Sequence, residues 1–231
     1  MTHHPWILGA VLIGLLLPGC SDKASSAGQS AATVINPGEA LEKLSAGNKR
    51  FLAGGMHTHS WQEEKIVKTS RFGQTPSVGI LGCADSRVPL ELVFDQGVGD
   101  LFVVRLAGFV ESAEATGTFE YGYAALGMHS LVVLGHTLCG AVNATLEGKD
   151  LPGSIPSIAA AIAPGVEAQI EESKSGLNDR ILRAAEEANV RYQKKRLLER
   201  SELLRTAEAE GKLTVLCAIY DVSTGEVRFL D

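Results

Sequence analysis

Three short, continuous apolar runs separated by helical segments constrain the fold of this chain most. They occupy 78–81, 101–104 and 131–134, and their sequences are Val-Gly-Ile-Leu, Leu-Phe-Val-Val and Leu-Val-Val-Leu. Such runs are typical of strands buried on both faces of a parallel sheet. Helices are predicted between them near 89–94 and over 113–126, and this alternation requires right-handed crossovers. The sequence therefore predicts an α/β fold with a mostly parallel central β-sheet flanked by helices.

The flanking segments extend the same domain, which we place at 37–231. The chain has 231 residues, of which 45% are hydrophobic and 21% charged, as in an ordinary globular domain. Its formal net charge of −6 argues against nucleic acid as a partner, because phosphate binding normally rests on a basic surface. Further helices are predicted over 39–52, 60–71, 155–170 and 178–204, and one or two strands over 213–220 and 227–230.

The N-terminal segment has a different character. Residues 6–17 are uncharged and almost wholly apolar, which suits the core of a signal peptide and is too short to span a bilayer. Pro18-Gly19-Cys20 follows at once and resembles the lipobox of bacterial lipoproteins. We therefore expect a signal peptide over 1–19, lipidation of Cys20 and a flexible linker over 20–36. This predicts a periplasmic domain held on a membrane by lipid, with a plain secretory peptide or an uncleaved tether as alternatives.

Metal-binding side chains follow two of the predicted strands. Cys83 comes directly after the first strand, and His136 and Cys139 come after the third. In open parallel sheets, sites assemble at the carboxyl ends of the strands. Thiolate and imidazole are the ligands that Zn²⁺ prefers. The sequence therefore predicts that Cys83, His136 and Cys139 bind one zinc ion.

A closed, structural zinc site would need a fourth protein ligand. Cys217 lies inside an apolar strand pattern, where a free cysteine usually behaves as a small buried hydrophobe. His57 and His59 lie in a glycine-flanked loop, and His129 precedes a buried strand, so none of them is a convincing ligand. Three ligands and an open fourth position are typical of catalytic zinc.

Asp85 and Arg87 lie beside the first of these ligands. A carboxylate two residues from Cys83 can reach the fourth position, and the arginine can hold it away in a charge-assisted pair. Zinc with two thiolates and one imidazole carries no net charge, so it should acidify its water less than a three-histidine site does. An acceptor at that water is then useful. We therefore expect Asp85 and Arg87 to be catalytic, the alternative being a pair that only stabilises a turn.

These two motifs resemble the signature of the β-class carbonic anhydrases over roughly 37–231. The signature consists of Cys83-x-Asp85-x-Arg87 after one strand and His136-x-x-Cys139-Gly140 after another. The resemblance implies reversible hydration of CO₂ to bicarbonate and a proton by attack of zinc-bound hydroxide, with one Zn²⁺ per subunit. Supporting segments stand in register at 74–76, 94–96, 99–105, 120–121 and 225–230.

The resemblance also implies roles for individual residues. Asp85 would accept a hydrogen bond from the zinc-bound water while paired with Arg87, or would bind zinc in a closed, low-pH form. Members are homodimers or larger homo-oligomers with an N-terminal helical arm packed on the partner, for which 39–52 is suited. Gln74 and Gly140 are implied to orient bicarbonate. Phe102 and Tyr121 are implied to line an apolar pocket that is formed partly by a neighbouring subunit.

Departures from the family pattern and competing functions stay open at this point. Leu106 follows Arg105 where many members have Asn, and Ile80 stands where the bicarbonate-inhibited members carry Trp. Hydrolysis of CS₂ or COS on the same fold is one alternative function. A non-catalytic, zinc-binding surface lipoprotein is a second alternative, and a redox protein that pairs Cys83 with Cys139 is a third.

Overall fold

The computed structural model describes residues 37–57 and 63–230. The predicted signal peptide, Cys20 and the linker lie outside the described residues. In chain order, the elements are α1 (Pro37–Leu52), α2 (Glu63–Phe72), β1 (Val78–Gly82), α3 (Leu90–Val93), β2 (Leu101–Arg105), the 3-10 turn η2 (Ala107–Phe109), α4 (Ala113–Leu126), β3 (Ser130–His136), α5 (Gly140–Glu147), α6 (Ile155–Ile162), the 3-10 turn η3 (Ala163–Gly165), α7 (Glu167–Ser173), α8 (Asp179–Arg200), α9 (Glu202–Ala209), β4 (Thr214–Tyr220) and β5 (Val227–Phe229).

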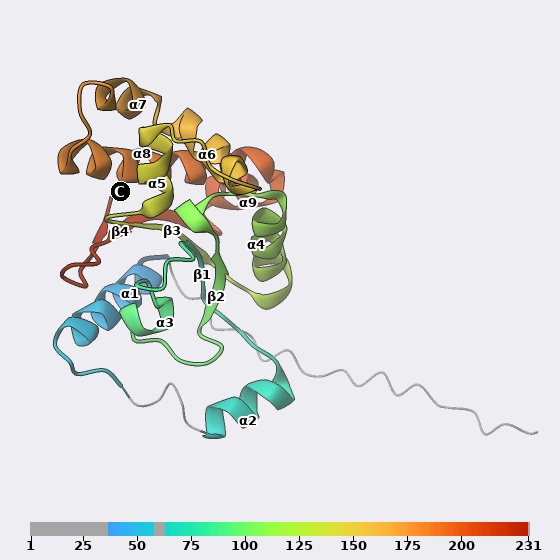
Figure 1. The fold of residues 1–231 in the computed structure, drawn as a ribbon. Helices are drawn as coiled ribbons and strands as arrows, with labels where there is room; N and C mark the ends of the chain where they lie inside the picture. Colours follow the sequence, from blue (N-terminus) through green and yellow to red (C-terminus); the bar gives the residue numbers. More distant parts are fainter. Residues whose placement is uncertain (1–36, 58–62, 231) are drawn as a thin grey trace, which may run out of the picture. The chain divides into compact units, whose positions relative to one another are not determined.

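The strands form one sheet of the predicted kind, in the order β2-β1-β3-β4-β5 (Figure 1). Strands β2, β1, β3 and β4 run parallel, whereas β5 pairs antiparallel with β4. The turn before β5 explains the exception, because antiparallel neighbours need only a short connection whereas parallel neighbours need a crossover. The α/β fold with a mostly parallel sheet is thus confirmed.

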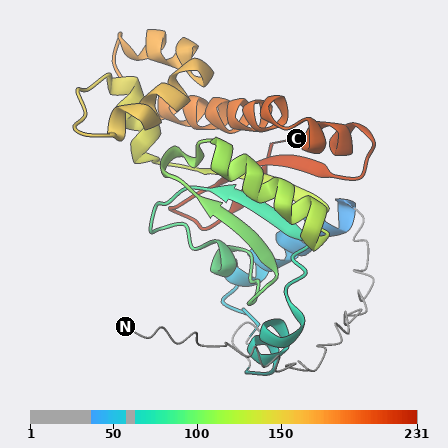
Figure 2. The ribbon, with the colours of Figure 1, turned by 90° about the vertical axis from the view of Figure 1, so that its right-hand side faces the viewer.

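Helices cover both faces of this sheet (Figures 1 and 2). Alternate residues of the strands point to opposite faces, so Leu131 and Val133 of β3 pack in one core and Val132 and Leu134 pack in the other. The first core is closed by α4, α5, α8 and α9, and the second by α1 and α3. Burial on both faces accounts for the continuous apolar runs at 78–81 and 131–134. The run at 101–104 differs from the prediction, because β2 is the edge strand and its residues are only partly buried.

Helix α4 occupies the predicted range and carries its own start and stop signals. The Ser112 side chain accepts a hydrogen bond from the amide of Ala115 at 3.2 Å, which caps the first turn. Gly127 ends the helix in the left-handed region, with φ of 74°. This crossover helix joins β2 to β3 and sets the two strands in parallel.

The helix predicted over 155–170 is interrupted. Pro164 lies in η3, which separates α6 from α7, and proline disrupts a helix because it has no amide hydrogen. The neighbouring Gly165 backbone lies against Tyr192, where a Cβ on the glycine would come within 2.5 Å of the tyrosine Cβ. The break therefore lets this segment pack closely against α8.

The helix predicted over 178–204 is also two helices, since α8 ends at Arg200. Ser201 starts α9, and its hydroxyl accepts a hydrogen bond from the Leu204 amide at 3.1 Å. Helix α5, which follows Cys139 directly, has no counterpart among the predicted elements.

Helix α1, the segment predicted to suit an arm on a partner, packs on its own chain. Ala40 and Leu44 are buried in the second core. The Asn48 amide donates to Val93 O at 3.1 Å and accepts from the Val227 amide at 2.9 Å. Helix α2, by contrast, has no buried residue. Helix α1 therefore buries one face in its own subunit, and the arm on a partner stays a prediction for its exposed face.

Within the two described ranges, no helix is both long and apolar enough to cross a bilayer.

Candidate metal centre

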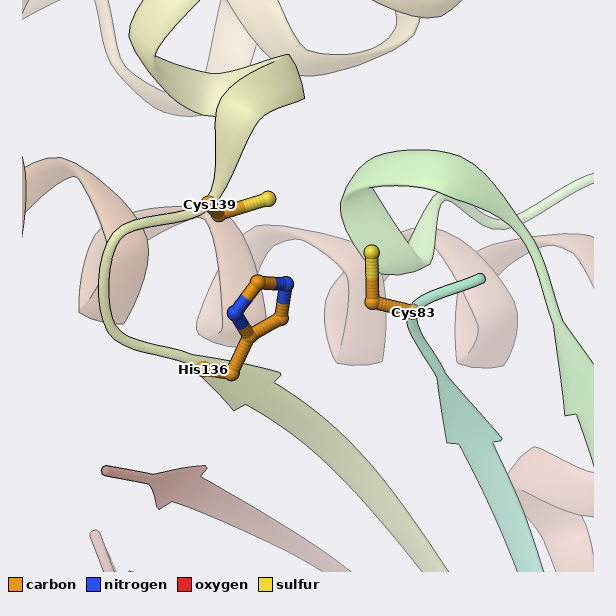
Figure 3. A group of neighbouring side chains, drawn as sticks. All are labelled: Cys83, His136 and Cys139. Atoms are coloured by element: carbon orange, nitrogen blue, oxygen red, sulfur yellow. The ribbon is translucent and has the colours of Figure 1, made fainter. Parts of the chain in front are cut away.

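The three predicted zinc ligands converge at one edge of the sheet (Figure 3). Cys83 follows β1, His136 is the last residue of β3, and Cys139 immediately precedes α5. Their ligand atoms all lie within 4.8 Å of one another. All three residues are buried, with exposed fractions of 4%, 0% and 1%.

The parallel register explains this convergence. Leu81 of β1 pairs with Val133 of β3, so the chain leaves both strands at the same edge. Cys83 lies two residues beyond its pair and His136 three residues beyond, which brings both side chains to the carboxyl ends of adjacent strands. This is the edge predicted from the sequence, because the carboxyl ends of neighbouring parallel strands meet there.

The ring of His136 presents one nitrogen to the two sulfur atoms. Its Nδ1 lies 2.9 Å from the carbonyl oxygen of Thr137. A carbonyl oxygen can only accept, so Nδ1 carries a hydrogen, and in the neutral ring the lone pair lies on Nε2. Nε2 is buried and has no hydrogen-bond partner among the described residues. Phe109 packs edge-on against the ring, with the centroids 6.4 Å apart. A buried, unprotonated nitrogen held in this orientation fits a zinc ion.

The two cysteines are suited to bind as thiolates. A hydrogen bond from the Cys139 thiol lowers the pKa of Cys83 far below its usual range. The same bond raises the pKa of Cys139, so a metal-free pair shares one proton. Cys139 also sits at the amino end of α5, where the helix dipole favours negative charge. Two sulfur donors and one nitrogen donor fit zinc, which would displace the shared proton.

Asp85 and Arg87 form the predicted pair beside this group. The Arg87 Nε donates to Asp85 Oδ1 at 2.9 Å and its Nη2 donates to Oδ2 at 2.7 Å. This bidentate bond holds the pKa of Asp85 well below its usual range, so the carboxylate is ionised at neutral pH. Asp85 Oδ2 also lies 3.9 Å from His136 Nε2. The carboxylate is thus both held by arginine and close to the metal-binding nitrogen.

The pair also stabilises its own turn, as the alternative interpretation required. The Arg87 amide donates to Asp85 Oδ1 at 2.9 Å. The same pair of side chains therefore stabilises the turn and places a carboxylate beside the metal-binding group.

Arg105 holds the same turn in place. In the sequence it was part of only a supporting segment of the family pattern, 99–105. It is the last residue of β2. Its Nε donates to Cys83 O at 2.8 Å and its Nη2 donates to Asp85 O at 2.6 Å. The signal for this role was present in the sequence, since Arg105 follows a predicted strand that neighbours the first ligand.

Glu186 of α8 is a contact that sequence reasoning missed. Its Oε1 accepts a hydrogen bond from the Cys139 amide at 2.8 Å. Burial raises the pKa of Glu186 to about 7. No local pattern could reveal this contact, because the two residues are 47 positions apart and meet only in the folded chain.

The expected substrate residues do not all reach the metal centre within one subunit. Gly140 is adjacent to Cys139 at the start of α5 and is exposed. Gln74 precedes β1 and so lies at the opposite end of that strand from Cys83. Phe102 pairs with Gly79, four residues before Cys83, which corresponds to about 13 Å along the strand. Tyr121 contacts Phe102, with the ring centroids 6.3 Å apart.

Cys217 behaves as the sequence predicted. It is buried in β4, among the apolar residues of the first core. The metal-binding group found in the described part of the chain does not include it. Cys217 is therefore no fourth ligand.

Comparisons with known proteins agree with this site. A family model described as carbonic anhydrase matches residues 78–227, which include all three ligands. Carbonic anhydrase 2 of Mycobacterium tuberculosis is 36% identical over 200 residues, covering 85% of this chain and 94% of its own. The carbonic anhydrase of Synechococcus elongatus is 30% identical over 81% of this chain and 70% of its own.

A solved structure shows the same architecture. The β-carbonic anhydrase CafA of Aspergillus fumigatus matches with a TM-score of 0.67 at 29% identity, over 83% of this chain and 91% of that one. The family model spans more than half of the sequence and the relatives span most of it. This chain therefore belongs to the β-class carbonic anhydrase family.

Proposed function

We propose that Cys83, His136 and Cys139 hold one zinc ion and that this site hydrates CO₂ reversibly to bicarbonate and a proton. The observation that carries the proposal is the convergence of two sulfur atoms and an imidazole nitrogen within 4.8 Å, in a buried position. Zinc bound there would act as a Lewis acid that lowers the pKa of a water molecule. Family membership supports the same reaction.

Asp85 and Arg87 supply the polar groups beside that position. An ionised carboxylate can only accept hydrogen bonds, so Asp85 would orient a water or hydroxide whose hydrogen points at it and whose lone pair points at CO₂. Arg87 neutralises the carboxylate and keeps it from binding the metal itself. In a closed, low-pH form, the still-ionised Asp85 carboxylate would leave Arg87 and bind zinc in place of the water.

The substrate pocket is completed, in this proposal, by a second copy of the chain. Gln74, Phe102 and Tyr121 lie away from the metal ligands of their own subunit, as described above. Tyr121 is 55% exposed although it is aromatic, and Phe72 of α2 is 80% exposed. Covering such surfaces favours a homodimer or larger homo-oligomer in which these residues line a partner's pocket.

Stopped-flow measurement of CO₂ hydration by the purified protein tests the activity, together with metal analysis. We expect one zinc per subunit, and cysteine thiols that resist alkylation until a chelator removes the metal. Zinc without CO₂ hydration, but with hydrolysis of CS₂ or COS, would establish the alternative enzyme. A disulfide between Cys83 and Cys139 with no zinc would establish the redox protein.

The lipidated, periplasmic location is a separate proposal. It rests on the apolar segment at 6–17 and on the cysteine that follows it. Replacing Cys20 by serine, in a bacterium that processes lipoproteins, should move the protein from the membrane fraction to the soluble periplasmic fraction. Cell fractionation and palmitate labelling measure this, with Ser21→Ala as the matched control. A Cys20→Ser protein that stays with the membrane would indicate an uncleaved tether instead.

A further inference from the structure

The loop that carries Cys139 adopts a backbone conformation that needs outside support. Leu138 has a φ of 58°, in the left-handed region that L residues other than Gly, Asn and Asp rarely adopt. Such a conformation persists only where surrounding contacts fix it. On one side, Arg87 Nη2 donates to the carbonyl oxygen of Leu138 at 3.0 Å. The contact on the other side comes from Glu186.

Glu186 meets a backbone group that has no partner in its own helix. Cys139 is the residue before α5, and the first amides of a helix have no acceptor within it. Because Cys139 is buried, its amide would lose a hydrogen bond without Glu186. Helix α8 carries Glu186 between Ala185 and Val190, which are wholly buried, so the carboxylate is held by a fixed part of the core.

Glu186 differs from the other buried acids of the described chain. Asp95 is paired with Arg50 and Glu111 with Arg200. Glu186 is 1% exposed, its Oε2 has no hydrogen-bond partner among the described residues, and within the same residues it forms no such ion pair. Burying a charged or polar group with unsatisfied hydrogen-bonding capacity costs stability. Because burying Glu186 costs stability and Glu186 contacts a predicted metal ligand, the contact points to a role in the metal site.

We propose that Glu186 is a positioning residue, which fixes the Cys139 thiolate for zinc by accepting the hydrogen bond of the Cys139 amide. This inference rests on the proposed zinc site. Residues that orient metal ligands typically change metal affinity about 10–100-fold when they are replaced. The hydrogen bond, rather than the negative charge, is the feature that matters in this proposal, so an uncharged acceptor of the same length should replace it.

Three variants separate the hydrogen bond from the charge and from simple packing. Glu186→Met has a similar length but no oxygen acceptor, and it should release zinc to a chelator roughly tenfold faster or more. Glu186→Gln retains an oxygen at the same place and should stay within about threefold of the natural protein, on the same scale. Glu187→Gln, which changes the adjacent, half-buried carboxylate that pairs with Arg228, is the matched control and should not alter the release rate.

The cobalt-substituted proteins give a second readout. A displaced Cys139 should shift the thiolate-to-cobalt absorption band in Glu186→Met, whereas Glu186→Gln should keep the natural spectrum.

The proposal is overturned if a folded Glu186→Met protein releases zinc at the natural rate, or if Glu186→Gln releases it as fast as Glu186→Met. If Glu186→Met does not fold, Glu186→Asp replaces it, because the shorter side chain draws the oxygen away from the amide and should speed release. Failure of the natural protein to bind zinc would contradict the proposed function itself.

Discussion

Replacing Cys139 by serine is expected to remove nearly all zinc from the protein and to reduce CO₂ hydration to the uncatalysed rate. The thiolate is one of only three protein ligands in the group, and serine offers a neutral hydroxyl that zinc binds poorly. The two ligands that remain bind zinc too weakly to keep it when the protein is diluted during purification. Metal analysis of the purified variant and stopped-flow hydration measure the two losses separately.

Cys217→Ser provides the matched control for this change. Cys217 is also a buried cysteine, but it lies in the core of β4 and outside the metal-binding group. The control should keep its zinc and its activity even if it loses some stability. An unchanged zinc content in Cys139→Ser would remove Cys139 from the ligand set, and with it the basis of the proposed reaction.

The second large effect is expected from Asp85→Ala, which should keep its zinc and lose most of its CO₂ hydration at neutral pH. Asp85 lies 3.9 Å from His136 Nε2 and is not needed to complete the three-ligand group. Its removal takes away the acceptor that would orient the attacking oxygen. We expect a loss of roughly 100-fold, at the lower end of what a positioned acid or base contributes.

The pKa of Asp85 strengthens this expectation. Because Arg87 holds that pKa well below its usual range, the carboxylate is charged throughout the neutral range, and its contribution should be present there in full. Asp150→Ala, which removes an exposed carboxylate, serves as the control and should leave activity unchanged. Full activity in a zinc-loaded Asp85→Ala protein would contradict the assigned role and leave Asp85 and Arg87 as a pair that stabilises the turn.

Prediction from the sequence succeeded where the signal was local and strong. The apolar runs at 78–81 and 131–134 became β1 and β3 because strands buried on both faces have no polar positions. It was less accurate where two helices adjoin without a loop. The break at Ser201 depends on a side chain that can bond either inside a helix or at its start, and the tertiary packing decides between the two.

The sequence by itself determined the fold class and the three side chains that converge as candidate zinc ligands, because a parallel sheet brings the ends of neighbouring strands together whatever the packing around them. Only the tertiary structure decided how those ligands are held. Arg105 reaches Cys83 from β2, and Glu186 reaches Cys139 from α8. Such contacts join residues far apart in the chain, and their hydrogen bonds depend on the exact position of one backbone against another, which no local pattern of residues encodes.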